Sequence, residues 1–158
     1  MIIRMAEIPE QGRQYVGEDP SEVLELESEH DIHAEGPVSY NFHAQTAPGE
    51  LIVRGSISVP VSFRCSKCAE PFKMTIKEPN FASVREAERD QSVDLTGEMR
   101  EAIILAFPNY PVCKSDCKGL CARCGASLNR EQCDCKGNKG NVWAALDGLE
   151  LKKENKGE

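Results

Sequence analysis

Alternating apolar and polar side chains predict β-strands over the first half of the chain. The clearest run is 51–65, where Leu, Val, Ile or Phe occupies every second position from 51 to 63 except Gly55, with polar or small residues between most of them. Successive side chains of a strand point to opposite faces, so this alternation indicates a strand with one buried face. Weaker alternation over residues 1–8, 24–34, 38–44 and 72–76 predicts further strands. Together they predict an antiparallel meander of about four to five strands with one wet face.

A single helix is predicted near residues 95–107, where apolar side chains recur with the spacing of one helical face. Asp94 or Thr96 is expected to cap its first turn, and Pro108 is expected to end it. The polar residues 84–91 are expected to leave the sheet as an excursion before the helix. The predicted fold class is therefore α+β, a β-meander with one helix and a cysteine-rich end.

The chain carries eight cysteines, and six of them follow the predicted helix. We therefore expect a sheet and helix domain over 1–111 and a cysteine-rich zinc-knuckle module over 112–158, the two packed as one unit. The module is expected to end in a short helix over 142–149. The N-terminus lacks a basic stretch followed by an apolar one, so we expect no export signal and a cytoplasmic chain. In that compartment thiols bind metal more often than they form disulfides.

The strongest metal-binding pattern is Cys121-Ala-Arg-Cys124-Gly, which is typical of a zinc knuckle. Cys133-Asp-Cys135 supplies a second pair of thiols, and eight residues separate it from Cys124. Four thiolates suit tetrahedral zinc, and a full set leaves no open position for water. The sequence therefore predicts a structural Zn²⁺ site made of Cys121, Cys124, Cys133 and Cys135.

The other four cysteines leave two alternatives open. Cys113 and Cys117 lie close enough in the sequence to replace one of the last two ligands of the knuckle. They can also join Cys65 and Cys68, which fall where the chain turns between two strands, in a second tetrathiolate site. One zinc ion is therefore expected, and the cysteine count allows a second.

Enzyme classes are poorly supported by the sequence. The spacing Cys117-x-x-x-Cys121-x-x-Cys124 is one that radical enzymes use for an iron–sulfur cluster, but those enzymes need a barrel of ~200 residues or more. No nucleophile, paired acid and base, or phosphate-binding glycine loop stands out. We expect a protein that is not an enzyme.

Charge divides the chain into an acidic and a mildly basic part. Residues 1–50 carry eleven acidic and two basic side chains, so the net charge of -7 is concentrated there. The acidic segment 18–35 is either a solvated face or a docking surface for a basic protein. Basic side chains in the module are candidate RNA contacts, because phosphate binding needs Lys and Arg. These candidates are Lys114, Lys118, Arg123, Arg130 and Lys136.

Several blocks of the sequence resemble one known family, the YceD or large ribosomal RNA subunit accumulation proteins. These blocks are Leu-Ala-Phe-Pro (105–108), Cys-Lys-Gly-Leu-Cys-Ala-Arg-Cys-Gly (117–125), Ser-Leu-Asn (127–129), Cys-Asp-Cys (133–135) and Cys-Ser-Lys-Cys-Ala-Glu-Pro-Phe (65–72). The resemblance implies a non-enzymatic ribosome biogenesis factor that supports accumulation or processing of 23S ribosomal RNA during large-subunit assembly. Its implied partner is ribosomal RNA or a large-subunit assembly intermediate, with no membrane involved.

One competing function follows from the thiols themselves. A site built from two close cysteine pairs opens when its thiolates are oxidised, which is how a redox-regulated zinc-thiolate chaperone works. The two functions differ in one observable property, because only the chaperone needs peroxide to switch on its activity.

Overall fold

The computed structural model describes residues 1–26 and 31–135 of the chain. Its elements are β1 (Ile2–Arg4), η1 (Met5–Glu7), β2 (Arg13–Asp19), η2 (Ser21–Leu24), β3 (Ile32–Ala34), β4 (Val38–Ala47), β5 (Glu50–Arg64), β6 (Pro71–Glu86), β7 (Ser92–Asp94) and α1 (Thr96–Leu105). Five strands form the main antiparallel sheet, and β1 and β7 form a separate two-stranded sheet. The main sheet is antiparallel as predicted, but only β4, β5 and β6 follow one another as in a meander, because β2 pairs with β4 and β3 pairs with β5. The small sheet was not predicted.

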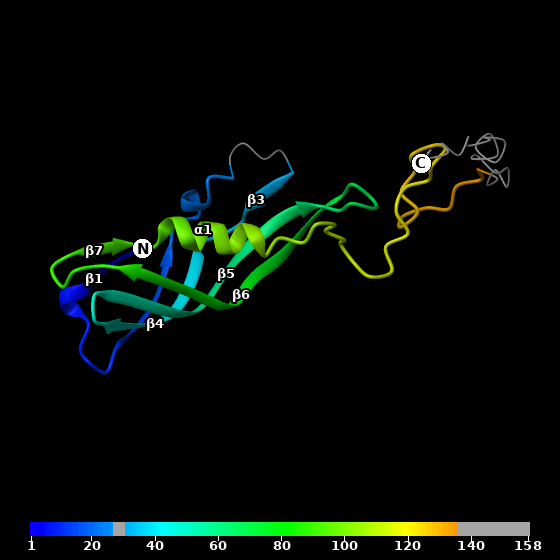
Figure 1. The fold of residues 1–158 in the computed structure, drawn as a ribbon. Coiled ribbons are helices and arrows are strands. Elements are labelled where there is room, and N and C mark those ends of the chain that lie inside the picture. Colours follow the sequence, from blue (N-terminus) through cyan, green and yellow to red (C-terminus); the bar gives the residue numbers. More distant parts are fainter. Residues whose placement is uncertain (27–30, 136–158) are drawn as a thin grey trace, which may run out of the picture.

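The long strand β5 organises the main sheet (Figure 1). One of its edges pairs with β6 along the whole strand, and the other pairs first with β4 and then with β3. A register shift interrupts the β5–β6 ladder just after Gly55. A Cβ atom at Gly55 would lie 2.0 Å from the carbonyl oxygen of Asn41, so only glycine lets β4 approach so closely.

The core lies between one face of this sheet and α1, as the alternation predicts. Apolar side chains of β5 such as Val53 and Val59 are fully buried, and Met99 and Ile103 of α1 are fully buried opposite them. The ring of Phe107, just after α1, meets Phe63 of β5 edge to face at 5.3 Å between centroids. Each such side chain contributes roughly 1.5–3 kcal/mol by its burial.

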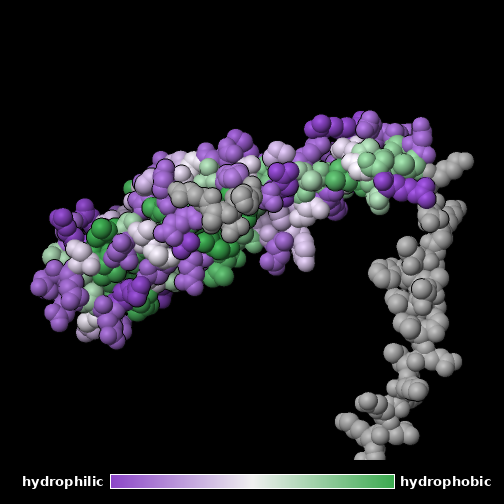
Figure 2. Space-filling model, turned by 90° about the horizontal axis from the view of Figure 1, so that it is seen from above, coloured by the Kyte–Doolittle hydropathy of each residue, from purple (hydrophilic) through white to green (hydrophobic). Residues whose placement is uncertain are grey.

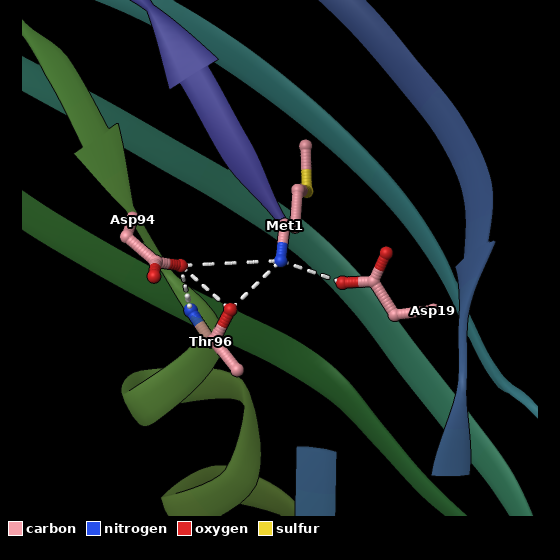
Figure 3. A network of polar contacts seen from close by, with 4 residues as sticks. All are labelled: Met1, Asp19, Asp94 and Thr96. Carbon is pink, nitrogen blue, oxygen red and sulfur yellow. Dashed lines mark hydrogen bonds and ion pairs between the residues drawn. The ribbon is translucent and has the colours of Figure 1, made fainter. Parts of the chain in front are cut away.

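The start of α1 is tied to both sheets by the amino group of Met1 (Figure 3). This amino group lies 2.6 Å from the carboxylate of Asp19 in β2 and donates to the hydroxyl of Thr96 at 2.8 Å. Asp94 accepts hydrogen bonds from the hydroxyl and the backbone N–H of Thr96, and these bonds lower the pKa of the Asp94 carboxyl. The N-cap residue itself is Leu95, not Asp94 or Thr96 as predicted, although Asp94 still satisfies an N–H of the first turn.

Two predicted strands near the N-terminus are wrong in extent. Within 1–8, only Ile2–Arg4 is a strand, and a 3-10 helix follows it. Within 24–34, only Ile32–Ala34 pairs with β5, and residues 27–30 lie outside the described residues. Leu24, which seemed to begin this strand, instead ends η2 and is fully buried there. Its apolar character reflects packing of a short helix rather than the alternation of a strand.

The predicted excursion over 84–91 is also wrong at its start. β6 continues past Pro79 to Glu86, and its pairing with β5 runs on to Glu50. The inner face of this extension buries Phe81 and Ser83, while Ala82 between them and residues 84–86 after them are exposed. The strand therefore persists because its partner is long, although its own sequence has lost the apolar pattern.

The described part of the cysteine module, residues 112–135, lies beyond the β5–β6 hairpin and stands off from the sheet (Figures 1 and 2). The helix predicted over 142–149 lies outside the described residues. Among the residues that the structure describes, no helix is long and apolar enough to cross a membrane.

Candidate metal centres

The structure groups the eight cysteines into two sets of four. The first cluster consists of Cys65, Cys68, Cys113 and Cys117, and the second cluster consists of Cys121, Cys124, Cys133 and Cys135. Within each cluster the sulfur atoms lie within 4.8 Å of one another. This grouping corresponds to the alternative with two separate sites, and no cysteine of one cluster is exchanged into the other.

The first cluster joins two segments that are far apart in the sequence. Cys65 and Cys68 lie in the turn between β5 and β6, which is closed by a hydrogen bond of 2.8 Å from the Ala69 N–H to the Cys65 carbonyl. Cys113 and Cys117 come from the chain after α1. The first cluster therefore connects the tip of the hairpin to the beginning of the module.

The sulfur separations in the first cluster suit a tetrahedral metal ion. Cys65 Sγ lies 3.9 Å from Cys117 Sγ, and Cys68 Sγ lies 3.8 Å from Cys113 Sγ. Four sulfurs at ~2.3 Å from a central zinc ion would be separated by about 3.8 Å. The donor set and its dimensions thus fit zinc, with no position left for water.

Hydrogen-bond donors and burial give the thiols of the first cluster different acidities. Burial opposes ionisation of Cys65, but backbone N–H groups, led by that of Cys113, outweigh it and lower the pKa to about 6. Burial, followed by hydrogen bonds with the neighbouring thiols, raises the pKa of Cys113 to about 12. Without a cation, the four thiols therefore do not all ionise near neutral pH. A divalent metal ion would supply the charge that lets all four become thiolates.

The second cluster lies in the module and is more open to solvent. The thiol-bearing turn is closed by the Gly125 N–H, which donates to the Cys121 carbonyl at 2.9 Å, and Gly125 adopts a left-handed conformation with φ 72°. Backbone N–H groups of Cys124 and Arg123 lower the pKa of Cys121 to about 6. Cys124 is exposed, whereas three cysteines of the first cluster are buried. These two N–H groups point at one sulfur, as a knuckle turn requires.

The two clusters are connected by hydrogen bonds that cysteine spacing does not reveal. Asn129 donates from its side-chain amide to Cys117 Sγ at 3.3 Å and accepts from the Lys118 N–H at 2.9 Å. The Leu120 N–H donates to the Lys67 carbonyl at 3.2 Å, so the module contacts the hairpin turn through its backbone. The chain that carries the second cluster is thus held directly against the first. Asn129 falls in the Ser-Leu-Asn block, but its role as a sulfur partner could not be read from the sequence.

The candidate RNA-contact residues that the structure describes are exposed, but some of them form ion pairs with acidic side chains. Arg130 lies 3.0 Å from the carboxylate of Glu70, and Lys114 lies 4.0 Å from that of Asp116. The side chains of Lys118 and Arg123 are exposed and form no ion pair with other described residues. Lys136 lies outside the described residues.

The acidic segment 18–35 uses much of its charge within the protein. Asp19 binds the amino group of Met1, and Asp31 lies 2.6 Å from Arg64. Glu25 and Glu35 pair with Arg100 and Lys73, respectively. These carboxylates therefore form ion pairs within the fold, in addition to any role in docking a partner.

Comparison with known proteins identifies a family whose sequence model matches part of this chain. The sequence model of the family described as large ribosomal RNA subunit accumulation protein YceD matches residues 82–150. An uncharacterized protein of Mycobacterium leprae is 27% identical over 111 residues, which are 58% of this chain and 49% of that protein. The chain therefore spans about half the length of the first curated relatives that it matches. No solved structure matches the chain.

Relatives whose names state a role agree with the family match. The large ribosomal RNA subunit accumulation protein YceD of Haemophilus influenzae is 28% identical over 122 residues, which are 65% of this chain and 68% of that protein. A chloroplastic YCED homolog 1 of Arabidopsis thaliana is 38% identical over 45 residues, which are 28% of this chain and 14% of that protein. The resemblance carried by the cysteine blocks is thus confirmed: residues 82–150 of the chain match the YceD family, and relatives named large ribosomal RNA subunit accumulation proteins are similar to it.

Proposed function

We propose that this protein is a non-enzymatic ribosome biogenesis factor of the cytoplasm that supports accumulation of 23S ribosomal RNA in large-subunit assembly. The proposal is supported by the family match and by the name of the relative in Haemophilus influenzae, a large ribosomal RNA subunit accumulation protein. Its partner would be ribosomal RNA or an assembly intermediate of the large subunit. A basic ribosomal protein that docks on the acidic segment 18–35 would be a second partner.

The single observation that carries the structural side of this proposal is the pair of tetrathiol clusters. Each cluster offers four sulfur atoms within 4.8 Å of one another, which is the donor set of a structural zinc ion. When zinc is bound, it supplies a closed cross-link rather than a reactive water. A zinc ion in the first cluster would hold the beginning of the module against the sheet and helix domain of residues 1–111, and a zinc ion in the second cluster would cross-link the module itself. The first cluster spans this boundary, which favours packing of the two regions as one unit.

The bases of the module would then lie on a fixed surface that RNA can approach. Lys118 is exposed between the two clusters and Arg123 is exposed in the turn from Cys121 to Cys124, and phosphate groups are the ligands that such side chains bind. Substitution of Arg123 by Glu is expected to weaken salt-dependent binding to fragments of 23S ribosomal RNA. Equal binding by the variant and the unchanged chain would remove Arg123 from the contact surface.

The function is tested in cells that lack the protein and carry a plasmid copy. The unchanged chain is expected to restore the ratio of large-subunit to small-subunit ribosomal RNA. The double variant Cys113→Ala/Cys117→Ala, which removes two thiols of the first cluster, is expected to restore it poorly at equal protein level. A normal RNA ratio in cells without the protein would contradict the proposed function.

The redox-regulated chaperone remains the second candidate because Cys124 is exposed and the pKa of Cys121 is lowered to about 6 by the Cys124 and Arg123 N–H groups. A thiolate that is present near neutral pH and open to solvent reacts readily with peroxide. This candidate requires that peroxide treatment of the purified protein suppress aggregation of an unfolded client. Unchanged client aggregation after such treatment would eliminate it.

A further inference from the structure

Tyr110 is an aromatic side chain that the fold leaves open to solvent. It is 81% exposed, which is the largest exposed fraction among the exposed large hydrophobic side chains of the described residues. Pro108 and Pro111 flank it, and proline restricts the backbone on both sides. The Pro111 carbonyl also accepts a hydrogen bond of 2.8 Å from the Ser66 N–H in the hairpin turn. The ring is therefore presented from a backbone with little freedom to move.

The first cluster lies directly behind this backbone. The Cys113 N–H, three residues after Tyr110, donates to Cys65 Sγ at 3.4 Å. The segment from Tyr110 to Cys113 thus runs along the same turn that carries Cys65 and Cys68. Because rigid surroundings reduce the entropy lost on binding, an exposed ring in this position is well suited to hold a ligand.

Two basic residues lie at the same turn. Lys67 follows Ser66 at the tip of the turn and is exposed, and its carbonyl accepts the Leu120 N–H at 3.2 Å. A Cβ atom at Gly119 would lie 3.0 Å from this carbonyl, so the chain that carries Lys118 touches the turn. Neither Lys67 nor Lys118 forms an ion pair with another residue in the described ranges. The turn therefore presents an exposed ring together with two uncompensated positive charges.

We propose that Tyr110 stacks on an unpaired base of RNA while Lys67 and Lys118 bind the phosphates next to that base. Aromatic side chains bind single-stranded RNA by stacking on base faces, and Lys or Arg side chains along the strand bind its backbone. A base inside a duplex has both faces covered by its neighbours, so the ring selects unpaired segments. This inference rests on the proposed function, because it assumes that the chain meets ribosomal RNA, and it adds the kind of RNA that is bound.

The test measures binding of the zinc-loaded full chain to a fluorescent single-stranded RNA of about ten nucleotides, a length typical of such sites. A duplex of the same sequence serves as the second probe. Tyr110→Ala is expected to weaken binding of the single strand about fivefold or more and to leave duplex binding unchanged. Tyr110→Phe keeps the ring and is expected to bind like the unchanged chain. Lys67→Glu is expected to weaken binding of both probes, because it removes a phosphate contact.

Matched controls separate this site from general effects on the protein. Leu105→Ala removes an equally exposed side chain from α1, and Lys77→Glu reverses an exposed charge on β6. Both controls are expected to bind the single strand like the unchanged chain. An adenine analogue whose fluorescence falls on stacking, placed in the single strand, is expected to be quenched by the unchanged chain and not by Tyr110→Ala.

Three results would overturn the inference. These are unchanged single-strand binding by Tyr110→Ala, equal loss of single-strand and duplex binding in that variant, and no binding of either probe by the unchanged chain. A Tyr110→Ala variant that binds RNA normally but loses a protein partner would assign the ring to a protein interface instead. The proposed function is judged separately, by the ribosomal RNA ratio in cells without the protein, so either idea can fail while the other stands.

Discussion

Removing the two module ligands of the first cluster should destabilise the whole sheet domain, whereas removing two ligands of the second cluster should not. The first perturbation is Cys113→Ala/Cys117→Ala, and its matched control is Cys133→Ala/Cys135→Ala. Both double variants delete half of a tetrathiol cluster. They differ in the length of chain that each cluster would close and in what is held at its two ends.

The magnitude follows from the length of chain that each cross-link closes. Cys68 and Cys113 are 45 residues apart, and a covalent cross-link over that distance restricts the unfolded chain by about 4 kcal/mol. Cys124 and Cys133 are nine residues apart, and the same relation gives about 2.6 kcal/mol. The second loop lies entirely within the module, so its loss opens that loop and leaves the sheet intact.

The assay is urea unfolding of zinc-loaded protein, followed by far-ultraviolet circular dichroism because the sheet dominates this signal. The free energy of unfolding is expected to fall by about 4 kcal/mol for the first variant and by less than about 1 kcal/mol for its control. A chelator should lower the stability of the unchanged chain toward that of the first variant. Equal stability of the two variants, or a larger loss in the control, would refute the reasoning.

Three further predictions concern the core, the helix start and the exposed thiols. Met99→Ala leaves a cavity under α1 and should lower the free energy of unfolding by about 2–5 kcal/mol, while the exposed Leu105→Ala should change it by less than about 0.5 kcal/mol in the same melts. Asp94→Asn should destabilise the protein at a pH above the pKa of an ordinary carboxyl, because the lowered pKa of Asp94 adds stability there. The difference in stability from the unchanged chain should disappear as the pH falls through the folded-state pKa of Asp94. Acid titration followed by circular dichroism tests this. Peroxide should release zinc from the second cluster before the first, since Cys124 is exposed, and a chromogenic chelator measures this; simultaneous release from both would contradict it.

Local patterns predicted those parts of the fold in which neighbours in sequence decide the structure. The run 51–65 became β5 (Glu50–Arg64) because its alternation is strict, and 95–107 became α1 (Thr96–Leu105) because its apolar stripe has helical spacing. The strand Arg13–Asp19 was missed. Its Val16 is exposed and its polar residues do not alternate clearly, so only its pairing with β4 makes it a strand.

In the candidate sites, too, local sequence patterns predicted only the contacts between residues that are near in sequence. Spacing identified Cys121 and Cys124 as a knuckle, because those residues share one turn. It left the partners of Cys113 open, because two of the three other sulfur atoms in its cluster come from a hairpin more than forty residues earlier in the chain. Asn129 and Tyr110 gave no chemical signal in the sequence. Asn129 gains its role from the sulfur atom of Cys117, and Tyr110 gains its role from the hairpin turn, which is hydrogen-bonded to Pro111 beside it.

The metal content of the native chain tests the central claim, that two closed tetrathiolate sites hold the module, most directly. Native mass spectrometry of the full chain, purified without added metal or chelator, should give a mass that corresponds to two bound zinc ions, one for each cluster. The Cys113→Ala/Cys117→Ala variant should retain one zinc ion. A chain that carries no metal, or whose mass shows disulfides in place of zinc, would contradict the account.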